Sequence, residues 1–258
     1  MKRNASIQYQ LAGWIKPLVM YYLFMAAYLV ISLLSFIRNS AYPDNTGLGI
    51  SSIYFYYWGF DTMIVLFAIG FFSFKSTFDM LIQNGYSRRK IFTGGMLAFL
   101  GISTVTTIFD TIVGQILNRW EGMGNDLYYY GAFDYYLTHS GKDLLTVLLP
   151  VFILNICVYM AVLASSWFFA AAAYRLDKNV RLLFFIVMPL LILLMLMIQE
   201  RFFTQVSIAN LISSGLGYVF GWSNGANPRI GVAVSLIILA GVSTFTLLLQ
   251  TRITPQPE

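Results

Sequence analysis

Residues 143–171 read DLLTVLLPVFILNICVYMAVLASSWFFAA, and this run of apolar side chains decides the fold class. A helix needs about 20 residues at 1.5 Å each to cross the hydrocarbon core of a bilayer, so the run is long enough to span it. Across the chain, 58% of the residues are hydrophobic and 10% are charged, whereas a soluble domain carries about 25% charge. The sequence therefore predicts an all-α polytopic membrane protein and excludes a cytosolic enzyme, a secreted disulfide module and a disordered regulator.

Five further segments resemble this run, so we expect six transmembrane helices in a single transmembrane domain covering residues 1–258. The predicted spans lie near residues 17–37, 53–73, 93–117, 143–171, 180–199 and 230–250. Residues 202–222 are also apolar, but several glycines and polar residues interrupt them. Because irregular backbone at membrane depth is tolerated only against protein or water, we expect this stretch to be a re-entrant or interfacial segment before the last span.

The basic residues predict the orientation of the chain in the membrane. If the N-terminus is cytosolic, six spans place most of the 16 Lys and Arg residues in the inside loops, as the positive-inside rule requires. Both termini are then cytosolic. The net charge of +5 is explained by this topology, and we expect no nucleic-acid partner.

Residues 6–16 predict an amphipathic helix ahead of the first span. Ile7, Leu11, Trp14 and Ile15 recur at helical spacing, which favours a helix lying on the inner leaflet of the bilayer. Trp14 would anchor this helix at the membrane interface. The alternative interpretation is a frayed N-terminus.

A cytosolic segment, 74–91, follows the second predicted span. Its apolar side chains form one helical stripe, made of Phe74, Phe78, Leu81 and Ile82. Gly85 is suited to the left-handed residue that ends a helix, and Ser87 fits the N-cap of the next one. We therefore expect a short cytosolic helix, a glycine turn and a new helix. The apolar stripe needs either a partner protein or the lipid headgroups, and composition does not decide between them.

Residues 84–92, NGYSRRKIF, resemble the loop between the second and third spans of bacterial ABC exporter permeases of the six-helix class. In that family a hydrophobic–Gly–x–Ser–Arg–Lys/Arg–x–hydrophobic stretch commonly follows a coupling helix, which sits in a groove of the ATPase subunit. The family also has an N-terminal interface helix and short re-entrant helices before the last span, similar to residues 6–16 and 202–222 here.

The resemblance implies a permease subunit in a bacterial cytoplasmic membrane, with an ABC ATPase subunit and a second permease subunit as partners, in a homodimer or a heterodimer. It implies an ATPase-coupling role for Phe78, Leu81, Ile82, Gly85, Arg88 and Arg89. The substrate and the direction of transport are not specified. The only Gly-Lys pair, Gly141-Lys142, has Tyr136 where a phosphate-binding loop needs its first glycine. ATP hydrolysis is therefore expected on another polypeptide.

Polar residues inside the predicted spans indicate a possible translocation path. Asp61 and Asp110 lie at similar predicted depth, with Gln115 and Asn155 nearby. A charge at bilayer depth is costly unless it faces water or a partner, so these residues predict a lining for a cationic or hydroxyl-rich substrate. The alternative is structural, with Asp61 capping a shorter span and Asp110 either protonated or hydrogen-bonded between helices.

Two other functional classes stay open on these residues. A proton-coupled carrier would use Asp61 and Asp110, and a non-transporting membrane protein would serve in immunity, sensing or assembly. The chain has one cysteine and one histidine, so we expect no catalytic residues, no metal site and no cofactor.

Overall fold

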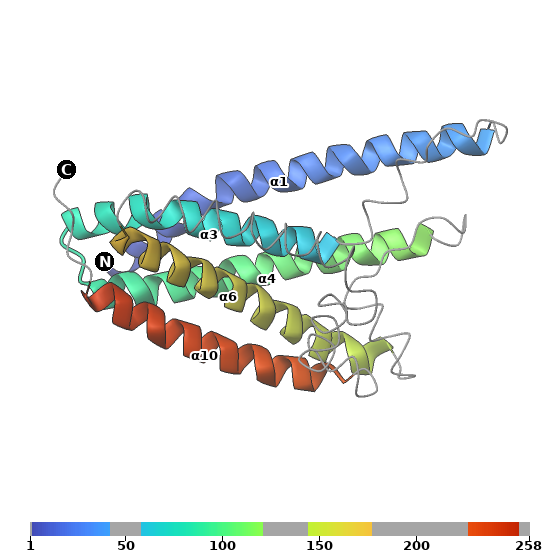
Figure 1. Ribbon diagram of the computed structural model, residues 1–258. Helices are drawn as coiled ribbons and strands as arrows, with labels where there is room; N and C mark the ends of the chain where they lie inside the picture. Colours follow the sequence, from blue (N-terminus) through green and yellow to red (C-terminus); the bar gives the residue numbers. More distant parts are fainter. Residues whose placement is uncertain (1, 42–57, 121–143, 177–226, 253–258) are drawn as a thin grey trace, which may run out of the picture.

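The computed structural model describes residues 2–41, 58–120, 144–176 and 227–252, and these stretches form five α-helices with no strand among them. The helices are α1 (Lys2–Ala41), α3 (Trp58–Gln83), α4 (Arg88–Trp120), α6 (Leu144–Arg175) and α10 (Pro228–Arg252). They lie side by side as an elongated bundle (Figure 1). The predicted all-α fold is confirmed for this part of the chain.

Four of these helices contain segments that are long and apolar enough to cross a membrane. The segments are Asp61–Gln83, Arg88–Val113, Leu148–Arg175 and Pro228–Thr251. They overlap the predicted spans at 53–73, 93–117, 143–171 and 230–250. The predicted span at 17–37 falls within α1 and is not among the four, while 180–199 and the re-entrant segment 202–222 lie outside the described residues. A total of six spans therefore stays a prediction.

The outer surface of the bundle differs from that of a soluble protein. Large apolar side chains face outward, with exposed fractions of 78% for Phe72, 71% for Met20 and 70% for Ile237. Several polar side chains are buried beside the apolar core, including Thr62 and Thr107, which are fully enclosed. Apolar groups gather on an outer surface when that surface contacts lipid rather than water. The four apolar helices and this distribution together make the protein a membrane protein.

Residues 6–16 belong to the first turns of α1, which continues through Pro17 without ending. Proline removes one backbone hydrogen bond within a helix and usually bends it, and α1 changes direction toward its N-terminal end (Figure 1). Trp14 is only 1% exposed and stacks on Phe99 with ring centroids 5.1 Å apart. The prediction that Trp14 anchors the segment in the headgroups is wrong, because it packs into the protein core. A position of residues 6–16 along the inner leaflet stays a prediction.

Two hydrogen bonds between helix ends give the relative directions of α4, α6 and α10. Arg88, at the start of α4, donates from Nη1 to the carbonyl of Thr251 at the end of α10 over 2.6 Å. Arg175, at the end of α6, donates from Nη2 to the carbonyl of Leu249 over 3.2 Å. Helices α6 and α10 therefore run parallel to each other and antiparallel to α4.

The start of α1 and the ends of α3, α6 and α10 lie at the same end of the bundle as the start of α4 (Figure 1). We call this the basic end, because it carries Arg88, Arg89, Lys90 and Arg175. Both described chain ends are thus on one side of the bundle, as expected for termini that share a compartment. That this compartment is the cytosol stays a prediction from the charge distribution.

Candidate functional site

The conformation of the turn between α3 and α4 is determined by the residues of the turn itself. Gly85 has a φ of 76°, a left-handed conformation that only glycine adopts at little cost. The Gly85 amide donates to the Ile82 carbonyl over 2.8 Å, and the Tyr86 amide donates to the Leu81 carbonyl over 3.0 Å. This pair of bonds is the Schellman arrangement that ends a helix. The Ser87 carbonyl then accepts the first bond of α4 from the Ile91 amide, over 3.0 Å. The predicted glycine turn and N-cap position are confirmed.

Residues 74–83 are not a separate cytosolic helix, because α3 continues without a break from the predicted second span to Gln83. The apolar stripe of this segment also faces inward. Phe78 and Leu81 are 1% and 2% exposed, and both belong to the core of the bundle. Ile82 is partly buried against the same core. These three side chains do not form an exposed docking surface in the structure.

The exposed residues of the turn are polar or basic. The exposed residues in this part of the chain are Gln83, Asn84, Gly85, Ser87, Arg89 and Lys90. Arg88 is half-buried through its bond to α10. Helix α3 has 26 residues and is about 39 Å long at 1.5 Å per residue, against a hydrocarbon core of about 30 Å. Helix α3 is therefore long enough for its C-terminal end, and the α3–α4 turn that follows it, to project beyond the hydrocarbon.

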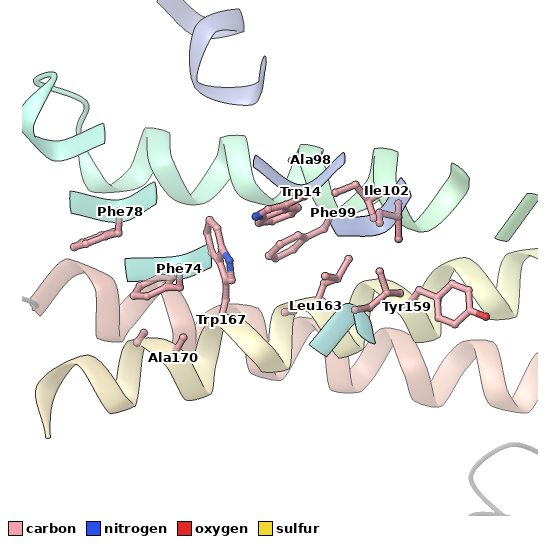
Figure 2. Packing of buried hydrophobic residues seen from close by; sticks show 14 of the residues in the cluster. Trp14, Phe74, Phe78, Ala98, Phe99, Ile102, Tyr159, Leu163, Trp167 and Ala170 are labelled. Atoms are coloured by element: carbon pink, nitrogen blue, oxygen red, sulfur yellow. The ribbon is translucent and has the colours of Figure 1, made fainter. Parts of the chain in front are cut away.

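A group of aromatic rings fills the bundle behind the turn. This aromatic cluster consists of Trp14, Phe74, Phe78, Phe99 and Trp167, which come from α1, α3, α4 and α6 (Figure 2). Trp167 lies at its centre, with ring centroids 4.9 Å from Phe99, 5.5 Å from Phe74 and 6.0 Å from Trp14. Such edge-to-face contacts add to the energy of burial, so four helices are joined at this level.

A buried carboxylate lies farther along the bundle. Asp110 of α4 is 5% exposed, and each of its oxygens accepts a hydrogen bond from a tyrosine. The Tyr159 hydroxyl of α6 donates to Oδ2 over 2.5 Å, and the Tyr22 hydroxyl of α1 donates to Oδ1 over 3.1 Å. Hydrogen bonds to a charged acceptor are stronger than neutral ones. Asp110 thus joins three helices, as the structural interpretation of this residue expects.

Hydroxyl groups precede Asp110 on the same face of α4. Ser103, Thr106 and Thr107 are all fully buried, and their spacing from Asp110 is that of one helical stripe. The hydroxyls of these three residues have no hydrogen-bond partner among the described residues. We call Tyr22, Ser103, Thr106, Thr107, Asp110 and Tyr159 the polar cluster.

Among the described side chains, the other residues predicted to line the translocation path do not bond directly to Asp110. Asp61 is half-exposed in the first turn of α3, which begins at Trp58, so the alternative interpretation, in which Asp61 caps the helix, is wrong. The Tyr21 hydroxyl is 3.2 Å from that of Thr62, the residue after Asp61, and the next residue of α1, Tyr22, bonds to Asp110. Two adjacent tyrosines of α1 therefore lie between the regions of the two acids.

Asn155 and Gln115 do not add a described bond to the polar cluster. Asn155 is half-buried in α6, one turn before Tyr159. Gln115 is in α4, but its side chain is outside the part of the chain that the structure describes.

Sequence reasoning missed the two tyrosines and the three hydroxyls of the polar cluster. The hydroxyls carried a signal, since Ser103, Thr106 and Thr107 repeat at the helical spacing that leads to Asp110. Tyr22 and Tyr159 carried none, because they reach Asp110 from other helices. The bond of 2.9 Å that Asp79 accepts from the Tyr174 hydroxyl, near the basic end, was also missed.

Taken together, the helices and the polar cluster define a polytopic α-helical membrane protein with buried polar groups between its helices. Within the described residues, no group of three or more His, Cys, Asp or Glu side chains is placed to hold a metal ion. No protein-family model, curated protein or solved structure matches the chain.

Proposed function

We propose that the protein is the transmembrane permease subunit of a bacterial ABC transporter, of the exporter type, driven by an ATPase on a separate polypeptide. The observation that carries the proposal is the α3–α4 turn, with its NGYSRRKIF sequence, glycine cap and exposed basic residues. The turn lies at the basic end, which the positive-inside rule assigns to the cytosol, where ATP is available. A second permease subunit completes the proposed assembly.

The burial of Phe78 and Leu81 changes the role proposed for them. As core residues they transmit movement rather than contact the ATPase. Phe78 lies edge-on to Tyr174 of α6 with ring centroids 6.1 Å apart, and the Tyr174 hydroxyl bonds to Asp79 one residue further along α3. A closely packed interface passes displacement on instead of absorbing it, because interiors have low compressibility. A push on the turn would therefore move α3 and α6 together.

Arg88 extends the same connection to a third helix. Arg88 is the first residue of α4, and its guanidinium donates to the Thr251 carbonyl at the end of α10, where the helix C-terminus favours a cation. The exposed Arg89 and Lys90 next to it are free of such bonds in the described residues and supply positive charge to a partner surface. In the proposed mechanism the ATPase contacts the exposed part of the turn, and Arg88 carries the movement to α10.

The proposal is tested by purifying the tagged full-length chain from its own host in mild detergent. We expect an ATP-hydrolysing protein with a phosphate-binding loop to co-purify, identified by mass spectrometry and by ATPase activity. The double variant Arg89→Glu, Lys90→Glu should reduce the co-purified ATPase at least tenfold. The matched control is Arg229→Glu, which reverses an exposed charge at the opposite end of the bundle and should have no effect. Absence of any ATPase, or equal retention by both variants, would refute the coupling role of the turn.

A further inference from the structure

We propose that the inward face of α4 between Ser103 and Asp110 is a binding site for a small monovalent cation. The site lies within the polar cluster, and it depends on neither the ATPase nor the coupling turn. The proposal concerns a bound ligand within the bundle, whatever solute the protein moves.

The first argument is the behaviour of the hydroxyls on α4. Threonines on its other faces bond back to their own helix: Thr104 donates to the Leu100 carbonyl over 2.8 Å, and Thr111 donates to the Thr107 carbonyl over 2.7 Å. The Ser103 and Thr107 hydroxyls are fully buried and have no hydrogen-bond partner among the described residues. Buried hydroxyls without a partner are costly, so a ligand or water is expected to complete them.

The second argument is the chemistry of the side chains that gather there. All the polar side-chain atoms of the cluster are oxygens, from one carboxylate, two phenols and three aliphatic hydroxyls. The two tyrosine hydroxyls donate their protons to Asp110, so neither directs a proton at a ligand. Alkali cations prefer oxygen ligands, as hard cations generally do, and a carboxylate in the set disfavours an anion. The composition of the cluster therefore selects a cation.

The third argument is the position of the site along the bundle. The aromatic cluster separates Tyr159 from the basic end, since Trp167, Trp14 and Phe99 lie between Tyr159 and Phe78 (Figure 2). Toward the other end, the Tyr21 hydroxyl lies 3.2 Å from that of Thr62, which directly follows Asp61, so a second carboxylate lies on that side. Asp61 is half-exposed at the start of α3. A cation would therefore reach the site from the end of the bundle that carries Asp61.

The first test measures thermal unfolding of the purified full-length chain in NaCl, KCl and choline chloride at equal ionic strength. Binding to the folded state alone raises the melting midpoint, and we expect a rise of about 3 °C or more in Na⁺ or K⁺ over choline. Thr107→Val and Asp110→Asn should abolish the difference, while Thr104→Val, the matched control, should keep it. Identical midpoints in all three salts, or a difference that survives both Thr107→Val and Asp110→Asn, would overturn the site.

A second test does not depend on the stability of those variants. Ser103→Cys, in a chain with Cys157→Ala, is treated with a small cationic methanethiosulfonate reagent. We expect labelling at least tenfold faster than for Ala98→Cys, which is equally buried on α4 but lies outside the stripe of hydroxyls. Na⁺ or K⁺ should slow the labelling relative to choline. Equal rates at the two positions would show that the region is dry packing, and labelling that no cation slows would show water without a cation site.

Discussion

Replacing Gly95 with alanine should destabilise the bundle, because Gly95 lies directly against Trp167. A Cβ at this position would overlap the six-membered ring of Trp167, at its Cη2 and Cζ3 atoms. The ring has no room to move aside, since it is 1% exposed and is held by Phe99 and Phe74. Overpacking of this kind costs about 1–3 kcal/mol, and the better helix propensity of alanine recovers up to about 1 kcal/mol. The two terms together centre on a net loss of about 1–2 kcal/mol, which corresponds to a fall in melting midpoint of about 2–8 °C.

The matched control is Gly101→Ala in the same helix. The nearest atom to its new Cβ is Leu11 Cδ2 at 4.0 Å, so the methyl group fits, and we expect a stability equal to or above that of the unmodified chain. The assay is tryptophan fluorescence during heating of the detergent-purified protein, checked by size-exclusion chromatography. The packing around Trp167 would be refuted if Gly95→Ala melted no lower than the unmodified chain, or if Gly101→Ala fell by as much.

Two further predictions concern the polar cluster and the turn. Tyr159→Phe removes the 2.5 Å bond to Asp110 and should lower the free energy of unfolding by about 1.5–3 kcal/mol, more than Tyr22→Phe, which removes the 3.1 Å bond. Thermal melts of both variants check the order, and equal losses would contradict it. Gly85→Ala places a Cβ at a φ of 76° and should cost about 1–2 kcal/mol, although no atom lies within 4 Å. Gly13→Ala also has open space around it, but within a helix, and should cost nothing in the same measurement.

The features that sequence predicted well are those that depend on neighbouring residues. The α3–α4 turn was predicted in detail, because a glycine that ends a helix and a serine that begins the next act within a few residues of each other. The apolar spans in α3, α4, α6 and α10 were predicted for a similar reason, since bilayer thickness sets a minimum length for an apolar run.

The sequence did not predict what the apolar face of a helix packs against. The stripe containing Phe78 and the one containing Trp14 have the spacing of amphipathic helices, and this spacing is the same whether the face meets lipid, another protein or the same chain. The structure places both residues in the core. Hydropathy also placed the end of the second span near residue 73, whereas the backbone hydrogen bonds continue to Gln83, where the glycine cap stops them. Hydropathy reports the extent of apolar surroundings, and the helix ends where its hydrogen bonding ends.

The polar cluster combines a predictable part and an unpredictable one. Asp110 was recognised because a carboxylate in an apolar run is costly. The hydroxyls before it could have been recognised as well, because they repeat at helical spacing along α4. Tyr22 and Tyr159 meet Asp110 only once α1 and α6 have packed against α4. A single sequence contains no local signal for such a meeting, because it depends on the relative rotation of three helices.

The burial of Trp14 has a consequence for the order in which the chain is assembled during synthesis. Its contacts are Phe99 on α4 and Trp167 on α6, both of which leave the ribosome well after α1 does. The first turns of α1 therefore wait at the membrane without their final neighbours until α6 has been inserted. A chain truncated before α6 should leave this N-terminal stretch open to proteases or to the insertion machinery, and completing α6 should close it.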